Sequence, residues 1–320
     1  MTNKALFLPY KIINNKPYYF ICNRINDKSG DALIPTGTCK AGETQANCAF
    51  RELCEELGVG GFSNFFPLGI DQKFTSSKES YFEKAFAFEI RDRIKLQRDE
   101  LSWHKFIPFK KALCKVKYDF HKRAIRLCDR ILHDKSYKKI FVVVGPGGSG
   151  KDTLIDGALS VDKNLKRIKT IMTRSYKSGA DKKSRISVSE RELEKMESTG
   201  DIVEKNKISN YWFASSYKQI MGVLSLDVDG IVNLDINGTI YYKKHFSNVI
   251  SVFVSVPIDE LKARLIKRGR DDKKYIEERI KIAKEEIAKS EICDYTIVNR
   301  ENQIKKGMGE LICIIRENRK

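Results

Sequence analysis

The sequence lacks the features that mark several classes of protein. Its eight cysteines include no C-x-x-C pair, and its four histidines show no zinc-binding spacing. No apolar run approaches the ~20 residues of a transmembrane helix, and Met1–Tyr10 does not read as a secretory signal. It contains no internal repeat or low-complexity segment. We therefore expect a cytoplasmic protein with reduced thiols, and neither a membrane protein nor a zinc module.

Positive charge is in excess but is not concentrated in a tail. The 320 residues carry 60 Lys and Arg against 42 Asp and Glu, a formal net charge of +18. Residues 1–136 hold 24 basic and 16 acidic side chains, a difference of +8, which leaves +10 for residues 137–320. Such a balance is typical of a solvated lysine-rich surface. It would also steer polyanions such as nucleotides, phosphosugars or RNA ends toward the protein.

The length and the patterning predict two α/β domains, residues 1–136 and 137–320. In the first part, the apolar runs Ala5–Pro9 and Pro17–Asn23 flank Asn14-Asn15, which is a hairpin signal. Further strands are expected at 85–90 and 103–108, and helices at 42–58 and 110–132. This mixture predicts a layered α/β unit, and the boundary is placed in the polar stretch 133–139.

In the second part, the apolar and mostly β-branched run Ile140–Val144 is typical of a buried parallel strand. It leads directly into a glycine-rich loop and an amphipathic helix. Beyond it, strand-like runs at 230–235, 249–256 and 295–298 alternate with helical runs at 189–197, 257–267 and 274–289. The alternation predicts a doubly wound parallel sheet.

One predicted helix of the first domain gathers three carboxylates. Glu52, Glu55 and Glu56 stand at i, i+3 and i+4, so they share one helical face. Like charges stacked in this way repel each other, and a divalent cation with oxygen ligands compensates them best. Arg51 lies four residues before Glu55 and can orient it. A plain surface helix would explain these three residues alone, but the surrounding spacing is more specific.

Residues 37–59 fill every position of the pattern G-x5-E-x7-R-E-U-x-E-E-x-G-U, where U is aliphatic, and therefore resemble the Nudix box. The positions are filled by Gly37, Glu43, Arg51, Glu52, Leu53, Glu55, Glu56, Gly58 and Val59. The resemblance covers about residues 1–135. It implies a Nudix α/β/α sandwich that hydrolyses a nucleoside diphosphate linked to another group.

The same resemblance implies roles for individual residues. Glu55 and Glu56 would bind Mg²⁺, or alternatively Mn²⁺, and Glu52 would be a further ligand or the general base. Gly37 would offer its carbonyl, and the metal would lower the pKa of a bound water. Glu100, in a segment similar to several Nudix enzymes, is a candidate additional ligand. The segment 116–118 is similar to Nudix enzymes acting on nucleoside or pterin triphosphates, and the substrate stays open.

A glycine-rich loop in the second domain predicts an ATP site. Residues 145–153 read GPGGSGKDT directly after a predicted strand, so backbone N–H groups and a helix N-terminus can face phosphate oxygens. Lys151 would reach the β- and γ-phosphates. Asp152 stands where a Ser or Thr hydroxyl usually meets Mg²⁺. The expected binding residues are Gly145, Gly147, Gly148, Ser149, Gly150, Lys151, Asp152 and Thr153.

The order of motifs after this loop resembles the guanylate-kinase family over about residues 138–318. The resemblance implies that Arg174, Lys177, Glu204 and Tyr211 bind the phosphate acceptor, with Arg174 also acting in catalysis. Asp235 would lie near Mg²⁺, Asn299 near adenine, and Arg264, Arg268, Arg270 and Arg279 would be lid arginines that neutralise the transferring group.

The acceptor has two candidates. The G-K-D-T loop and Asn237-Gly238 are similar to ribose 1,5-bisphosphokinases, a branch of the same family, and Arg185 stands where guanylate kinases carry Tyr. We therefore expect ribose 1,5-bisphosphate, slightly favoured, or a nucleoside monophosphate such as GMP.

The leading hypothesis is a bifunctional hydrolase and kinase. In a coupled version, cleavage of ADP-ribose would yield ribose 5-phosphate, which is close to the substrate of the kinase branch. Two alternatives stand beside it: a kinase-like half that only senses nucleotides, suggested by Asp152, and an RNA 5′-end pyrophosphohydrolase.

Two substitutions separate the two predicted sites. We expect Glu56→Gln to abolish diphosphate hydrolysis and to leave phosphoryl transfer unchanged, because it removes one metal-binding carboxylate. Lys151→Ala should do the reverse. Both activities are measured on the full chain, and loss of both by either change would rule out independent sites.

Overall fold

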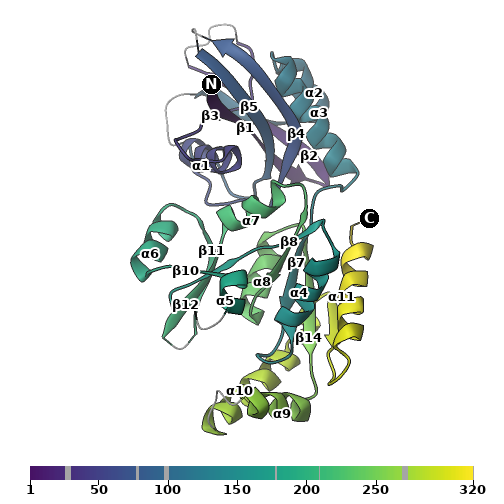
Figure 1. The fold of residues 1–320 in the computed structure, drawn as a ribbon. Coiled ribbons are helices and arrows are strands. Elements are labelled where there is room, and N and C mark those ends of the chain that lie inside the picture. The colour runs from purple at the N-terminus through teal and green to yellow at the C-terminus, as the bar shows by residue number, and fades with distance from the viewer. Residues whose placement is uncertain are drawn as a thin grey trace. The chain divides into compact units, whose positions relative to one another are not determined.

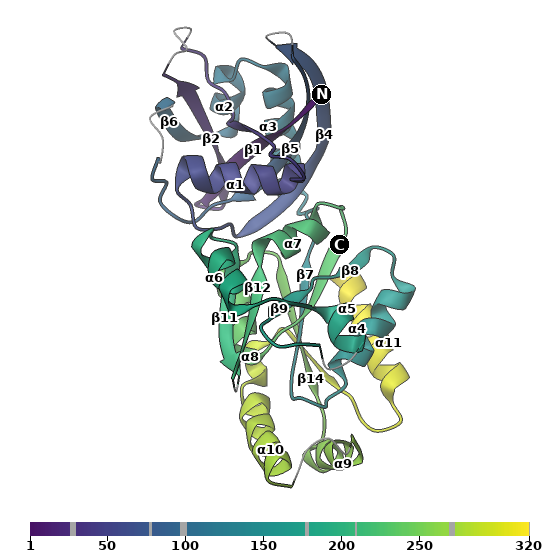
Figure 2. The same ribbon diagram turned by 60° about the vertical axis from the view of Figure 1, so that its left-hand side comes forward.

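A computed structural model describes residues 1–25, 30–76, 79–96, 101–176, 179–208, 210–268 and 273–319, without the side chains of 180, 268 and 273–275 (Figures 1 and 2). The chain divides into two compact units: the first holds Met1–Tyr137 with the segments Met196–Asp201 and Ile220–Asp227, and the second holds the other residues from Lys138 onward. Each unit is described by itself.

The N-terminal unit is built on a six-stranded mixed sheet of order β4-β5-β1-β2-β6, with β3 paired to β1. The pair β1–β5 is parallel, and the remaining pairs are antiparallel. The strands are β1 (Thr2–Ile13), β2 (Lys16–Arg24), β3 (Thr36–Thr38), β4 (Asn64–Ser76), β5 (Glu79–Glu89) and β6 (Leu101–Pro108), and the helices are α1 (Gln45–Leu57), α2 (Phe109–Lys115) and α3 (Asp119–His133).

Helices cover both faces of this sheet, as Figure 1 shows. On one face, Phe50 of α1 packs within an aromatic cluster with Phe62, Phe65 and Phe88. On the other face, α2 and α3 bury side chains such as Phe120 against alternate residues of the strands. The predicted α/β/α sandwich is confirmed.

The first hairpin follows from two asparagines. Ile13 of β1 pairs with Lys16 of β2, and the two residues between them, Asn14 and Asn15, have φ of 50° and 60°. Positive φ at both central positions is the geometry of a type I′ hairpin turn, which Asn tolerates better than most residues. The hairpin expected at this place is confirmed.

Strand β4 was not expected, because Pro67 and Gly69 interrupt its apolar pattern. The structure accommodates both residues at the edge of the sheet, where the pairing with β5 shifts register between Pro67 and Asp71. An edge strand with a bulge is where a proline costs least, since no ladder hydrogen bond is lost.

The C-terminal unit contains a five-stranded parallel sheet of order β15-β14-β7-β13-β8. Its core holds α4 and α11 on one face, and Ile236 of α8 and Ile287 of α10 on the other. The expected parallel sheet is confirmed. Its strands are β7 (Ile140–Val144), β8 (Leu165–Arg167), β13 (Asp229–Asn233), β14 (Val249–Ser255) and β15 (Tyr295–Val298), and its helices are α4 (Lys151–Val161), α8 (Ile236–His245), α9 (Ile258–Arg268), α10 (Lys273–Ala288) and α11 (Ile304–Glu317).

A second sheet of order β10-β9-β12-β11 stands apart from the parallel sheet and was not expected. Two of its strands are three residues long, too short for a periodic signal. Its strands are β9 (Thr170–Met172), β10 (Arg185–Ser187), β11 (Ile202–Ile208) and β12 (Tyr211–Ser216). The helices in the same stretch of sequence are α5 (Gly179–Ser184), α6 (Glu190–Ser198) and α7 (Tyr217–Leu224). A short 3₁₀ turn, Ser290–Ile292, comes shortly before β15 in the sequence.

Helix boundaries follow local chemistry. Helix α6 begins with a capping box, in which Ser189 Oγ accepts from Glu192 N at 3.2 Å and Ser189 N donates to Glu192 Oε2 at 2.7 Å. Asp235 was expected at the end of a strand, but β13 ends at Asn233 and Asp235 is the N-cap of α8, accepting from Gly238 N at 2.7 Å.

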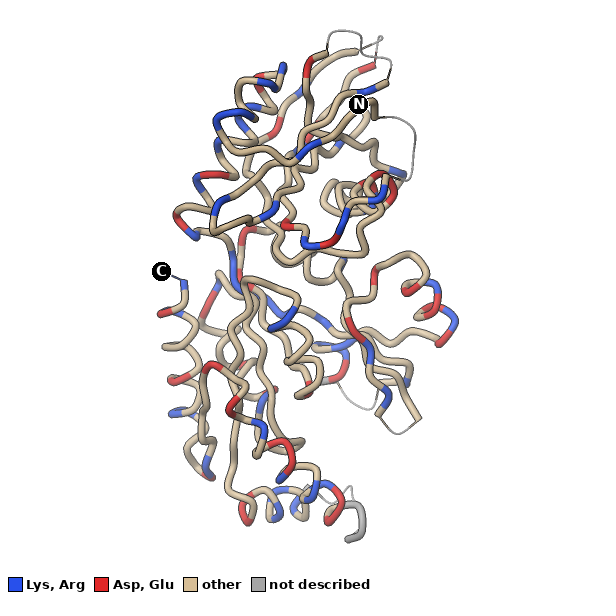
Figure 3. The backbone as a smooth tube through the Cα atoms, turned by 180° about the vertical axis from the view of Figure 1, so that it is seen from behind, with Lys and Arg blue, Asp and Glu red and all other residues tan. Residues whose placement is uncertain are grey.

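Charge is distributed along both units. Figure 3 shows basic and acidic residues interspersed through the helices and strands of each. Among the described residues, no helix combines the length and the apolar character needed to span a membrane.

Candidate active sites

The carboxylate site of the N-terminal unit is organised by one arginine. Arg51 donates to both carboxylate oxygens of Glu43 at 2.9 Å, to Glu52 Oε1 at 2.7 Å and to Glu55 Oε2 at 3.2 Å. It also donates to the carbonyl oxygen of Thr38 at 3.0 Å. The hydrogen bond to Glu43 raises the pKa of Arg51. Burial opposes ionisation of Glu43, but its bonds to Arg51 and to Lys40 N outweigh burial and lower its pKa.

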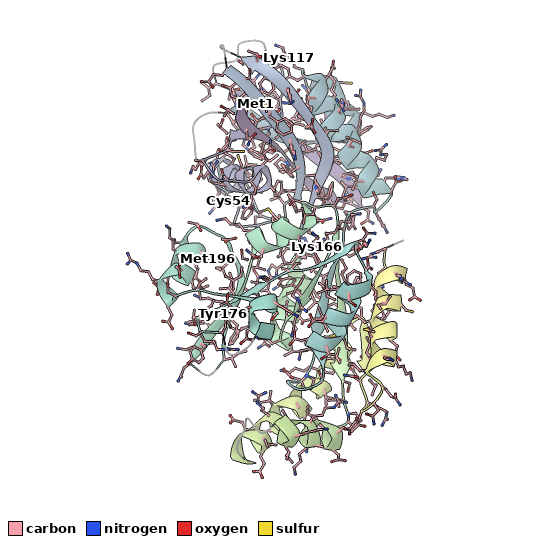
Figure 4. All side chains as sticks on the ribbon, in the orientation of Figure 1. Met1, Cys54, Lys117, Lys166, Tyr176 and Met196 are labelled. Carbon is pink, nitrogen blue, oxygen red and sulfur yellow. The ribbon has the colours of Figure 1, made fainter. Side chains whose placement is uncertain are left out.

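Gly37 lies directly against Glu52. A Cβ on Gly37 would stand 2.0 Å from Cγ of Glu52 and 2.6 Å from its Cδ, so β3 needs a glycine here for the carboxylate to pack. Glu52 is 8% exposed and is held by Arg51. Helix α1 carries Glu52, Glu55 and Glu56, and it ends at Gly58, whose φ of 61° closes the last turn; Cys54 of the same helix is labelled in Figure 4.

The donor set suits a hard divalent cation, although the acidic side chains do not converge on one point. In the described part of the chain, no three His, Cys, Asp or Glu side chains are arranged to hold a metal ion. The carboxylates of Glu52 and Glu55 instead meet the Arg51 guanidinium. Carboxylate and carbonyl oxygens are the ligands that Mg²⁺ prefers. A metal at this face therefore requires Glu55 to rotate from Arg51, which its partial exposure permits.

A buried histidine holds the segment that leads into β3, the strand that carries Gly37. His121 of α3 is 6% exposed, and its Nδ1 accepts from the backbone N–H of Ile34 at 2.9 Å. Burial lowers the pKa of His121 to about 4, which keeps the ring neutral and Nδ1 available as an acceptor. This role of His121 could not be predicted from the sequence, because its partner is 87 residues away.

In the C-terminal unit, a glycine-rich loop joins β7 to α4. Gly145, Gly148 and Gly150 have φ of 139°, 103° and 92°, backbone angles that residues other than glycine rarely adopt. A Cβ on Gly145 would stand 2.4 Å from the carbonyl oxygen of Val254. Lys151 donates from Nζ to the carbonyl oxygens of Gly145 at 2.6 Å and Pro146 at 3.0 Å. The loop thus has the conformation expected of a phosphate cradle.

The loop opens on a cavity of about 580 Å³ that lies within the C-terminal unit. It brings predicted residues together with others that the sequence did not single out. The predicted ones are Gly145, Gly147, Gly148, Gly150, Lys151, Asp152, Thr153, Glu204, Asp235 and Arg279, together with Arg185, which the sequence marked as a departure from guanylate kinases. The added ones include Ile208, Phe213, Asn233, Glu278 and Glu286.

Asp152 is held at the edge of this cavity. Its Oδ1 accepts from Asn233 Nδ2 at 3.1 Å and lies 3.6 Å from Arg167 Nη1. The side chain is about half exposed. Two like charges 4 Å apart repel by about 4 kcal/mol at an effective dielectric constant of 20, so an uncompensated carboxylate here would oppose a polyphosphate.

A second arginine complements Arg174 at the acceptor side. Arg174 donates to both oxygens of Asp181, at 3.0 and 3.3 Å, and Arg185 donates to the same carboxylate at 2.8 Å. Arg185 also lies over the ring of Phe213, 5.6 Å from its centroid, and both line the cavity. Tyr176, labelled in Figure 4, accepts a hydrogen bond from the backbone N–H of Ser187.

Glu204 presents a buried carboxyl group to the cavity. Its Oε1 accepts from Ser215 Oγ at 2.9 Å. Burial raises the pKa of Glu204 to about 7, the hydrogen bond from Ser215 lowers it, and the nearby Asp235 raises it. Asn206 Nδ2 lies 3.2 Å from Glu204 and 3.4 Å from Asp235, linking the two carboxyl groups.

The remaining predicted residues have different surroundings. Asn299 is buried, and its Nδ2 donates to the carbonyl oxygen of Ser149 at 2.7 Å, so it fixes the loop directly. It also lines a smaller cavity of about 270 Å³ with Arg264. A Cβ on Gly147 would lie 3.0 Å from Arg279 Nη1, which places this arginine against the loop. Tyr211 is 42% exposed at the β11–β12 turn, two residues before Phe213, which does line the cavity.

Several predicted positions lie outside the described residues. These are Glu100, Lys177 and Arg270, together with the side chain of Arg268.

Comparison with known families assigns both units. Residues 137–318 match the family model of guanylate kinase, which is more than half of the chain. The chain belongs to the guanylate kinase family. Residues 12–128 match the model of the NUDIX domain, so a Nudix hydrolase domain is fused in front of the guanylate kinase domain.

Curated relatives match the guanylate kinase part. The guanylate kinase of Wolbachia pipientis wMel is 30% identical over 188 residues, 58% of this chain and 92% of the relative. That of Legionella pneumophila (strain Paris) is 28% identical over 185 residues, 56% and 86% of the two chains.

Solved structures overlap with each domain in turn. The guanylate kinase from Anaplasma phagocytophilum has a TM-score of 0.46 at 23% identity, over 57% of this chain and 87% of that one. The NUDIX domain of Shewanella oneidensis NrtR, complexed with ADP ribose, has a TM-score of 0.35 at 14% identity, over 41% and 87%.

The contact of Gly37 with Glu52 gives a prediction for the Nudix domain. Gly37→Ala should displace the Glu52 carboxylate and lower the rate of diphosphate hydrolysis by about 100-fold, since misplacement by ~1 Å has effects of this size. Gly60→Ala is the matched control, because a Cβ there has no neighbour within 4 Å. Equal rates for the two variants, measured with the same diphosphate, would contradict the packing argument.

The raised pKa of Glu204 gives a prediction for stability. The folded state binds a proton that the unfolded state releases above about pH 4.5, so this contribution is complete at low pH and is lost as pH rises toward about 7. Glu204→Gln should therefore stabilise the guanylate kinase domain at pH 8 by up to about 3 kcal/mol relative to its effect at pH 4.5. Urea unfolding of both proteins across this range tests it; a pH-independent difference would contradict it.

Proposed function

We propose that the Nudix domain hydrolyses a nucleoside diphosphate linked to another group. The observation that carries the proposal is the Arg51 network, which aligns Glu43, Glu52 and Glu55 on one side of α1 beside Gly37. Glu52, Glu55, Glu56 and the Gly37 carbonyl would hold Mg²⁺ or Mn²⁺. When bound, the cation would polarise the diphosphate and lower the pKa of a bound water.

The protein groups have separable tasks in this proposal. Arg51 orients Glu52 and Glu55, and its charge reduces the repulsion between them. Glu52, fixed against Gly37, accepts the proton of the attacking water or serves as a ligand. Glu100 is kept as a candidate further carboxylate, outside the described residues.

For the guanylate kinase domain we propose transfer of the γ-phosphoryl group of ATP to GMP. Lys151 would exchange the two loop carbonyls for β- and γ-phosphate oxygens, with Asp152 and Asp235 on the Mg²⁺ side. Arg279, and by motif Arg268, would neutralise the transferring group, and Asn299 would hold the loop. Catalysis then rests on positioning and charge neutralisation.

The residues that line the proposed acceptor end of the cavity favour GMP as the acceptor. Phe213 offers an aromatic face and Glu204 a carboxyl acceptor, and a purine base has both a flat ring and N–H donors. Arg174 and Arg185 on Asp181 would face the acceptor phosphate, and Tyr211 and Lys177 stay candidates by motif. Ribose 1,5-bisphosphate is the second candidate, because Arg185 adds a cation and Asp152 matches that branch.

The proposal takes residues 1–136 as the hydrolase domain and residues 137–320 as the kinase domain, and it treats the protein as a cytoplasmic enzyme of nucleotides or phosphosugars. The alternatives are a nucleotide-sensing C-terminal domain and an RNA 5′-end pyrophosphohydrolase. Cleavage of ADP-ribose to ribose 5-phosphate would connect the two domains.

A two-arm screen of the full chain tests the proposal. One arm supplies diphosphates that include ADP-ribose, nucleoside triphosphates and a 5′-triphosphorylated RNA. The other supplies ATP with GMP, other nucleoside monophosphates or ribose 1,5-bisphosphate. We expect hydrolysis to depend on Glu56, and ATP turnover to be fastest with GMP and to depend on Lys151.

Each other outcome has a definite meaning. Faster turnover with the bisphosphate than with GMP would replace the acceptor, and ATP binding without turnover would make the domain a sensor. Hydrolysis confined to the RNA would favour the end-processing alternative, and intact ADP-ribose would end the coupled hypothesis.

A further inference from the structure

The first turn of α4 places a carboxylate at the phosphate-binding loop. Asp152 follows Lys151 directly and lines the same cavity as Gly150 and Lys151. The helix dipole stabilises a carboxylate in the first turn. The same carboxylate repels a nucleotide polyphosphate that binds the amide groups of the loop. A loop that binds a polyphosphate therefore needs this charge to be countered by a fixed group.

Two neighbouring strands supply side chains that hold Asp152. Asn233 ends β13 and donates to Oδ1 of Asp152 at 3.1 Å. Arg167 ends β8, next to Lys166, which Figure 4 labels, and brings Nη1 to 3.6 Å from the same oxygen. Strands β8 and β13 are adjacent and parallel, so both side chains come from one end of the sheet.

Arg167 is buried but has one hydrogen-bonding position unused. Its side chain is 9% exposed, and Nη2 donates to Asp156 Oδ1 at 2.5 Å, one turn further along α4. Nη1 is buried and has no hydrogen-bond partner among the described residues, because 3.6 Å to Asp152 is too long for one. A buried N–H without an acceptor is uncommon. A short movement of the Asp152 carboxylate would supply the acceptor.

We propose that Arg167 is a positioning residue that neutralises Asp152 and draws its carboxylate away from the phosphates, so that the loop can bind a nucleotide polyphosphate. The inference rests on the proposed ATP site. When the polyphosphate binds, the Asp152 carboxylate moves toward Arg167 and accepts a hydrogen bond from Arg167 Nη1. Asn233 limits the movement by holding the same oxygen.

A competing reading makes Arg167 a clamp between β8 and α4 that acts through Asp156 alone. The two readings differ in one measurable respect. A clamp would matter equally whatever residue stands at position 152, whereas a counter-charge matters only when that residue is a carboxylate. A double-mutant cycle between positions 152 and 167 therefore separates them.

The experiment is titration calorimetry of the full chain with ATP, with Mg²⁺ and separately with EDTA. Arg167→Met should weaken ATP binding by about 10- to 100-fold, the size expected for a lost hydrogen bond between charged groups. In EDTA, where no Mg²⁺ can join Asp152 to the phosphates, Asp152→Ser should bind ATP as tightly as the parent chain or more tightly, because the substitution removes the repelling charge. Asp152→Ser with Arg167→Met should stay within about threefold of Asp152→Ser alone.

Control variants address folding and the clamp. Asp156→Asn should leave ATP binding within about threefold, and melting temperatures show whether each variant is folded. If Arg167→Met does not fold, Arg167→Lys, which keeps the charge, should bind ATP more tightly than Arg167→Gln, which does not. The Asp152→Ser arm does not depend on any change to Arg167.

Three results would overturn the inference. The first is an equal loss of ATP affinity from Arg167→Met in the parent and Asp152→Ser backgrounds. The second is a loss of ATP affinity from Asp156→Asn as large as that from Arg167→Met. The third is a more than tenfold loss of ATP affinity from Asp152→Ser in EDTA. Failure of the parent chain to bind ATP would overturn the proposed kinase function as well, whereas ATP binding without coupling between positions 152 and 167 overturns this inference alone.

Discussion

The constraint on both sites is electrostatic: negative groups that chemistry brings together need a fixed positive partner. In the Nudix domain the partner is Arg51, which binds Glu43, Glu52 and Glu55 at once. Because it is itself held by the Thr38 carbonyl, it also ties α1 to β3, where Gly37 lies. In the kinase domain the partner is Arg167, which donates to Asp156 and lies 3.6 Å from Asp152. Fold and charge are therefore set by the same contacts.

The elements that could be predicted from the sequence are those with local rules. Two asparagines suffice for the β1–β2 turn, and the spacing of Glu52, Glu55 and Glu56 predicts the face of α1 that they share. Strand β4 could not be predicted, since Pro67 and Gly69 break its pattern and are tolerated only at a sheet edge. That information is tertiary and does not exist in the local sequence.

In the kinase site, too, the residues that act within a short stretch of sequence could be predicted, and those that meet through tertiary contacts could not. The loop from Gly145 to Thr153 was visible because its glycines and Lys151 act within a few residues. The contact between Arg185 and Phe213 could not be predicted, because the two residues lie on different short strands of the second sheet, which was itself not expected. The resemblance pointed to Tyr211, whereas the residue that lines the cavity is Phe213, two positions later.

The bond from Asn299 to Ser149 has a consequence for how the protein is made. It joins residues 150 positions apart, so a loop that follows β7 is held by an amide side chain that follows β15. A ribosome must therefore add the 150 residues that follow Ser149, up to Asn299, before this loop acquires its supporting contact. The Nudix network, from Thr38 to Glu55, is complete much earlier. The contacts of the carboxylate network can therefore form before the contact that holds the glycine-rich loop.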